Sequence, residues 1–244
     1  MNKLYNKSEL WFAITWIIIY ILGTLILDNI SAAINIVNFL TPIFYLLLCS
    51  ILIIWICKNN YKEKFGLCKS PFNAKYFLYF IPLLILISIN FWFGINLTNN
   101  LIESVLFIIS MLCVGFLEEI IFRGFLFKAM EKDSLKWAIV VSSLTFGFGH
   151  IINLFSANAD IVNTILQICY ATTTGFLFVI IFYKGKTLLP CIITHSLFNA
   201  LSLFAKGTSL LVNIIITIVM MALTIIYSII LIKILPKEQS EIKK

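Results

Sequence analysis

The 18 residues from Leu10 to Leu27, LWFAITWIIIYILGTLIL, contain no charged side chain. A helix rises about 1.5 Å per residue, so a run of this length can cross the hydrocarbon core of a bilayer. Lys3 and Lys7 precede the run, as in a secretory signal peptide, but the apolar part of a signal peptide is only about 7 to 15 residues long. The run therefore predicts a retained first transmembrane helix.

The rest of the chain is equally apolar. Of the 244 residues, 61% are hydrophobic and 12% are charged, whereas soluble domains carry about 25% charged residues. Lipid requires backbone polar groups to pair internally, which favours helices. We predict an all-α fold, a polytopic transmembrane helix bundle that is surrounded by lipids and occupies residues 1–244 as a single integral membrane domain. The apolar runs predict about eight spans, at residues 10–27, 36–57, 76–95, 101–128, 137–156, 161–183, 187–205 and 209–235.

Positive charges lie in alternate connections between these runs. Lysines occur in the N-terminus, in the second, fourth and sixth connections and in the C-terminal tail, whereas the other connections together contain only Lys206. Because lysine and arginine collect on the cytoplasmic side of a membrane, both termini are predicted to be cytoplasmic. The same rule accounts for the net charge of +7, so we expect no nucleic-acid partner.

A few polar side chains interrupt the apolar runs at membrane depth, where ionisable groups are costly and are candidates for function. They fall on the fourth, fifth and seventh predicted spans and comprise Glu118, Glu119, Arg123, His150, Asn153, His195 and Asn199. The rise per residue places Glu118, His150, His195 and Asn199 about 12–20 Å from the lysine-rich ends of their helices. These four groups are therefore expected to form one layer in the cytoplasmic half of the membrane.

Helical spacing gives these side chains different expected roles. Glu119 and Arg123 are four residues apart, so they share a face and can form an ion pair. Glu118 points about 100° away and is left as a carboxylate for general-base catalysis. His195 and Asn199 also lie four residues apart and present an imidazole and an amide, which can stabilise a developing oxyanion.

The segment around His150 adds further candidates. Asn153 follows it by three residues and is a secondary candidate for the site. Gly147 and Gly149 precede it, and small residues in membrane helices allow neighbouring helices to approach closely. We therefore predict a close helix contact at these two glycines.

Three short motifs stand in order on separate predicted spans: EEIIFR at 118–123, FGFGH at 146–150 and HSLFN at 195–199. They resemble the Glu-Glu-x-x-x-Arg, Phe-x-x-x-His and His-x-x-x-Asn/Asp motifs of the CAAX protease and bacteriocin-processing (CPBP, or Abi) family of intramembrane proteases. The resemblance covers residues 111–205, which form the motif-bearing core.

The resemblance implies an intramembrane endopeptidase that hydrolyses a peptide bond in a membrane-associated protein or peptide. It implies that Glu118 activates water, that His150 assists, and that His195 and Asn199 stabilise the oxyanion. Structural support would come from Glu119 and Arg123.

The resemblance leaves the need for a metal open, because family members have been described both as metalloproteases and as glutamate proteases without metal. Glu118, His150 and His195 could provide three zinc ligands and leave one position open. However, the sequence has no His-Glu-x-x-His motif, and Asn199 beside His195 suits an oxyanion donor better than a zinc ligand. We therefore favour a site without a cofactor and retain Zn²⁺ as the alternative.

Two other functions remain open on the sequence alone. A non-catalytic bacteriocin-immunity or regulatory membrane protein could keep the same scaffold, and a proton-coupled transporter could use the carboxylates and histidines as a relay. The composition, rich in isoleucine, asparagine and lysine, indicates an AT-rich bacterial gene. The expected location is therefore a bacterial plasma membrane, where a prenylated substrate is not expected.

Overall fold

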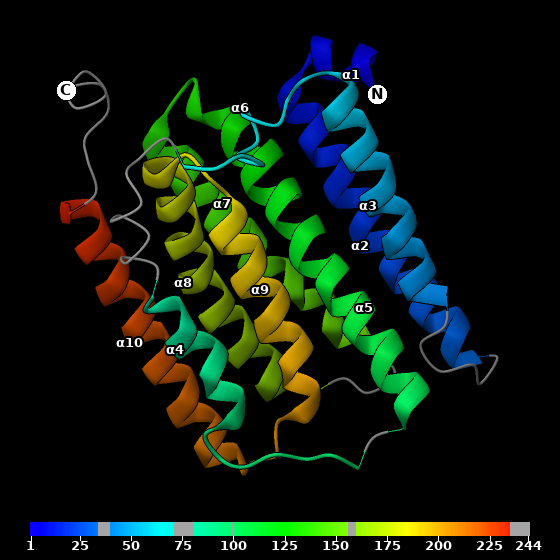
Figure 1. The fold of residues 1–244 in the computed structure, drawn as a ribbon, viewed down its shortest axis with the longest axis vertical. Helices are drawn as coiled ribbons and strands as arrows, with labels where there is room; N and C mark the ends of the chain where they lie inside the picture. The colour runs from blue at the N-terminus through cyan, green and yellow to red at the C-terminus, as the bar shows by residue number, and fades with distance from the viewer. Residues whose placement is uncertain (34–39, 71–80, 99, 156–159, 235–244) are drawn as a thin grey trace.

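The computed structural model describes residues 1–33, 40–70, 81–98, 100–155 and 160–234 (Figure 1). These ranges are helical between short connections and form no strand, which confirms the predicted all-α class. The elements are α1 (Asn2–Lys7), α2 (Glu9–Ala33), α3 (Leu40–Lys58), α4 (Leu83–Ser88), η2 (Ile89–Phe91), α5 (Leu101–Glu118), η3 (Glu119–Phe127), α6 (Lys128–Glu131), α7 (Leu135–Gly149), η4 (His150–Phe155), α8 (Ile161–Gly185), α9 (Leu189–Leu201), η5 (Ser202–Phe204) and α10 (Leu210–Ile234).

Within the described ranges, six helical segments are long and apolar enough to cross a membrane. They are Glu9–Ala33, Leu40–Lys58, Leu101–Glu131, Leu135–Phe155, Ile161–Gly185 and Leu210–Ile234. The span predicted at 187–205 corresponds to a shorter apolar helix, Leu189–Phe204. The span predicted at 76–95 begins outside the described residues, and its described part contains α4 and η2. The polytopic membrane character is thus confirmed, and the count of eight spans stays a prediction.

The long helices run in alternating directions, so each connection lies at one of two ends of the bundle (Figure 1). At one end, the Leu188 N–H donates to the Gly66 carbonyl at 2.8 Å, which joins the segment after α3 to the α8–α9 connection. At the other end, the Asn96 N–H donates to the Phe204 carbonyl at 2.9 Å. The chain therefore passes from one end to the other between Gly66 and Asn96, where the third span is predicted.

The lysines predicted to be cytoplasmic gather at one of these ends. The N-terminus, the segment after α3, the α6–α7 and α8–α9 connections and the end of α10 all lie toward it (Figure 1), and we call it the lysine-rich end. Lys206 lies at the opposite end, where its N–H donates to the Gly94 carbonyl at 3.3 Å. The arrangement fits the alternation of lysines in the sequence, while the side of the membrane that each end faces stays a prediction.

Two glycines allow helix backbones to meet. On α7, a side chain at Gly147 would overlap Thr172 of α8 and would lie 3.0 Å from the Ile168 carbonyl oxygen, so the predicted close contact is confirmed there. At Gly149 the prediction is wrong, because the nearest atom to an added Cβ is Phe122 Cζ at 3.9 Å, an ordinary contact.

A π-helix lies within the longest helical segment. η3 continues α5 without a break, begins directly after Glu118, and buries each of its nine residues. It packs against α2 and α7. Wider π-helical turns occur frequently at functional sites, and this one contains Glu119 and Arg123 of the first motif.

Candidate active site

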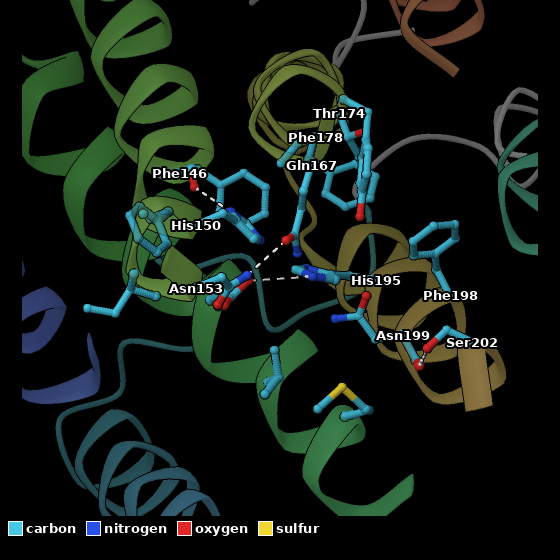
Figure 2. A pocket seen from close by; sticks show the side chains of 18 of the residues that line it. Phe146, His150, Asn153, Gln167, Thr174, Phe178, His195, Phe198, Asn199 and Ser202 are labelled. Carbon is cyan, nitrogen blue, oxygen red and sulfur yellow. Dashed lines mark hydrogen bonds and ion pairs between the residues drawn. The ribbon is translucent and has the colours of Figure 1, made fainter. Parts of the chain in front are cut away.

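The three motifs meet around one cavity of about 390 Å³ in the interior of the bundle. Glu118 reaches it from the end of α5, His150 and Asn153 from η4, and His195 and Asn199 from α9. In Figure 2 the two imidazoles and the two amides point toward a common space. The structure thus brings together the residues that the sequence places in one layer.

His195 lies between the two adjacent glutamates. Its Nδ1 is 2.8 Å from Glu119 Oε1, and its Nε2 is 3.5 Å from Glu118 Oε2. A carboxylate oxygen can only accept here, so Nδ1 carries the proton that is donated to Glu119. The ring is therefore oriented by Glu119 and turns its other nitrogen toward Glu118.

The predicted ion pair between Glu119 and Arg123 is present and fully buried. Arg123 Nη1 lies 3.1 Å from Glu119 Oε1, the same oxygen that accepts from His195. The guanidinium carbon also lies 4.0 Å from the centre of the Phe146 ring, a cation–π contact. Glu119 therefore links the arginine of the first motif to the histidine of the third.

Phe146 explains the first position of the second motif. Its ring touches Arg123 and makes edge-on contacts with His150 and His195, at centroid distances of 5.4 and 5.7 Å. Arg123 and Phe146 pack closely against Gly175 of the neighbouring α8, where an added Cβ would lie 3.1 Å from both Arg123 Nη2 and the Phe146 ring. One phenyl ring therefore separates the buried charge pair from the cavity and positions both imidazoles.

His150 is held by its own helix. Its Nδ1 lies 3.1 Å from the Phe146 carbonyl oxygen, drawn as a dashed line in Figure 2. Because a carbonyl can only accept, Nδ1 is the protonated nitrogen. In the neutral ring, Nε2 is then available to accept a hydrogen bond from a group in the cavity.

The two asparagines differ in their surroundings. The Asn153 amide donates to Gln167 Oε1 on α8 at 2.8 Å (Figure 2), and both side chains line the cavity. The backbone carbonyl of Asn199 accepts from the Ser202 hydroxyl at 2.7 Å, while its side chain lines the cavity one turn from His195. Asn199 is therefore placed beside the imidazole, as the four-residue spacing predicts.

Sequence reasoning missed several polar residues of the site, among them Gln167 and Tyr20. The Tyr20 hydroxyl on α2 donates to Glu118 Oε1 at 2.7 Å, and both side chains are buried. Tyr20, Thr24 and Asp28 follow each other at four-residue intervals and all line the cavity. That regular spacing of polar residues in an apolar span is the signal that could have revealed this wall of the site.

The described side chains include no group of three histidine, cysteine, aspartate or glutamate residues arranged to hold a metal ion. Glu118 and His195 approach each other, but His150 does not complete a set of three with them. The alternative zinc site suggested by the sequence therefore has no preformed set of three protein ligands in the described part of the chain.

The cavity has a buried and an exposed part. Glu118, His195 and Phe178 line it at less than a tenth of their full exposure, whereas Asp28 and Ser202 are exposed. Asp28 lies in the last two turns of α2 and Ser202 follows α9, so both lie toward the end opposite the lysines (Figure 1). The polar lining thus continues from the glutamates toward the lysine-poor end.

Comparison with known proteins supports the motif assignment. Residues 99–201 match the sequence model of a family described as type II CAAX prenyl endopeptidase Rce1-like. The match includes all three motifs and confirms the resemblance noted from them. No curated protein and no solved structure matches the chain. Residues 99–201 of the chain are therefore similar to the Rce1-like family of type II CAAX prenyl endopeptidases.

Proposed function

We propose that this protein is an intramembrane endopeptidase of the bacterial plasma membrane that hydrolyses a peptide bond in a membrane-associated protein or peptide. The observation that carries the proposal is Glu118. Its Oε2 is buried, has no hydrogen-bond partner among the described residues, and lies at the cavity beside His195. Together with the match to a protease family, a positioned carboxylate with one free oxygen supports general-base chemistry.

In the proposed reaction, Glu118 Oε2 accepts a proton from a water molecule as the water oxygen attacks the scissile carbonyl carbon. His150 Nε2 accepts a hydrogen bond from the same water and orients it. The carbon–oxygen bond formed by the attack produces a tetrahedral oxyanion. When this intermediate collapses, the carbon–nitrogen bond breaks and the proton held by Glu118 passes to the leaving amine.

The oxyanion is proposed to be stabilised by Asn199 and His195. The Asn199 amide can donate in either protonation state of the neighbouring ring. His195 Nε2 can donate only when the ring carries a second proton, because Nδ1 already donates to Glu119. Donors that are fixed before the reaction contribute most to this kind of stabilisation, and the contact with Glu119 fixes the His195 ring.

The experiment that tests the proposal compares purified wild-type protein with Glu118→Gln in nanodiscs. Each is incubated with a mixed library of membrane-associated peptides, with and without a chelator, and mass spectrometry identifies new termini. We expect cleavage by the wild type and at least about a thousandfold less by Glu118→Gln, because general-base catalysis and positioning are both lost. Cleavage that survives the chelator would support the scheme without metal.

A matched control lies on the same helix. Glu103 is in the first turn of α5, is exposed and does not line the cavity, so Glu103→Gln should cleave like the wild type. Undiminished cleavage by Glu118→Gln would overturn the proposal. If the wild type cleaves nothing, and protection against a bacteriocin survives Glu118→Ala and His150→Ala, a non-catalytic immunity function would replace it.

A further inference from the structure

We propose that Tyr20 is a positioning residue that selects which oxygen of Glu118 accepts the proton from water. Tyr20 lies on α2, outside residues 99–201 that match the family. The inference rests on the proposed general-base function of Glu118 and adds a wall of the site that the three motifs do not contain.

The hydrogen bond from Tyr20 makes the surroundings of the two carboxylate oxygens of Glu118 different. Oε1 accepts from the Tyr20 hydroxyl at 2.7 Å, in surroundings where Tyr20 is 7% and Glu118 9% exposed. Oε2 has no hydrogen-bond partner among the described residues and faces His195 Nε2 at 3.5 Å. The phenol therefore occupies one oxygen and leaves the other free for water.

Tyr20 is itself held in place by polar neighbours on α2 and α3. Its ring lies 5.8 Å from that of Tyr45, centroid to centroid, and Tyr45 also lines the cavity. The Thr24 hydroxyl lies 2.8 Å from the Tyr20 carbonyl and 3.2 Å from the Tyr45 hydroxyl. The Thr24 hydroxyl thus holds Tyr45, and the Tyr45 ring packs against the buried Tyr20 ring and restricts it. The Tyr20 hydroxyl can therefore fix the rotation of the Glu118 carboxyl group rather than follow it.

The position of the carboxyl group matters because a general base must lie within hydrogen-bond reach of the water that it deprotonates. Without Tyr20, the carboxyl group of Glu118 could rotate about its terminal bond, which has a broad torsional minimum. The buried Oε1 would also lose the donor that it has among the described residues. Tyr20 thus acts on catalysis through Glu118 and does not need to touch the substrate.

The kinetic test uses Tyr20→Phe, which removes only the hydroxyl. If the free energy of a hydrogen bond to a charged group is lost from the transition state, kcat should fall about ten- to a hundredfold, and KM should stay unchanged. Thr15→Val is the control, because Thr15 also carries a hydroxyl on α2 but donates to the Trp11 carbonyl in an exposed position; its kcat should equal that of the wild type. An unchanged kcat in Tyr20→Phe would overturn the inference while leaving the function of Glu118 intact.

A second test does not require a known substrate. The hydrophobic reagent dicyclohexylcarbodiimide modifies carboxyl groups within membranes, and peptide mapping reports its rate of addition at residue 118, with Glu118→Gln as the blank. Tyr20→Phe frees Oε1, so modification of Glu118 should be severalfold faster than in the wild type and in Thr15→Val. Equal rates would show that the phenol does not restrain this carboxyl group, and would reject the inference even if no peptide is cleaved.

Discussion

At the scale of residues, the two neighbouring glutamates differ in the charge of their hydrogen-bond partners. Glu119 is fully buried and accepts from both Arg123 and His195 through one oxygen. Glu118 instead accepts from the neutral phenol of Tyr20. Removing one member of a buried ion pair leaves the other member as an uncompensated charge in the interior. Removing the charge of a residue whose partner is neutral leaves no such charge. The two residues should therefore respond differently to the same substitution.

We expect Glu119→Gln to lower the stability of the fold, since it leaves the Arg123 guanidinium buried without its charge partner. Loss of one partner of a buried pair costs about 3–5 kcal/mol. Glu118→Gln should retain nearly all of its stability, because the pair with Arg123 remains. Thermal unfolding of both variants in the same detergent, followed by size-exclusion chromatography, provides the measurement. Equal unfolding temperatures for the two variants would contradict this division of roles.

The predictable part of the site is the part that lies within one helix. The pairing of Glu119 with Arg123 follows from a four-residue spacing, and the structure contains it. The bond from Tyr20 to Glu118 joins residues 98 positions apart, and their contact depends on how α2 is rotated against α5. The polar residues Tyr20, Thr24 and Asp28 mark the face of α2 that turns inward, but helical spacing within α2 does not show which residue of another helix that face meets.

At the scale of elements, the approach of α5 to α9 brings the first and third motifs together. An added Cβ on Gly115 would lie only 2.5 Å from the backbone nitrogen and 2.7 Å from the Cα of Ser196. Gly115 is three residues before Glu118, and Ser196 follows His195 directly. The absence of a side chain at Gly115 therefore sets the separation between the glutamate and the imidazole.

Gly115→Ala should push α9 away from α5. The Ser196 hydroxyl could rotate aside, but the backbone nitrogen and Cα of Ser196 could not. Overpacking of this kind costs about 1–3 kcal/mol, and a shift of about 1 Å in a catalytic group can lower the rate about a hundredfold. Peptide cleavage and unfolding temperature should both fall in Gly115→Ala.

Gly124→Ala is the matched control for this prediction. Gly124 lies in the same continuous helical segment, but its added Cβ would meet Phe65 at 3.6 Å, an ordinary contact. Gly124→Ala should therefore behave like the wild type. If both alanine variants keep full activity, the distance between α5 and α9 does not control the site.

The glycines also show why helix contacts were only partly predictable. The segment FGFGH predicts a close approach, and the structure places it at Gly147 alone, because Gly149 faces the open cavity. Gly115 is a single small residue in an apolar run and has no distinguishing neighbour in the sequence. The π-helix after Glu118 was not predicted either, since its hydrogen-bond pattern has no clear signature in residue type.

At the scale of the whole molecule, composition and lysine alternation predict the helical class, the positions of the helices and the end of the bundle at which each connection lies. They do not predict the contacts between individual side chains. The apolar runs agree with the helix bounds within a few residues over most of the described chain, because the thickness of a bilayer dictates span length. The sequence predicts the site in the cytoplasmic half of the membrane, but it does not predict toward which end of the bundle the cavity extends. Its polar lining continues toward Asp28 and Ser202, at the end of the bundle opposite the lysines.

The orientation of the bundle can be tested by single-cysteine labelling in intact cells, after the six native cysteines are replaced. Lys132→Cys, at the lysine-rich end, should resist a membrane-impermeant maleimide until the cells are opened, because this end is predicted to be cytoplasmic. Lys206→Cys should be labelled from outside. Asp28→Cys should share the side of Lys206→Cys, since Asp28 is exposed toward the same end. Labelling of Lys132→Cys and Lys206→Cys from one side would refute the predicted topology, whereas labelling of Asp28→Cys together with Lys132→Cys would mean that the polar lining leads to the cytoplasm.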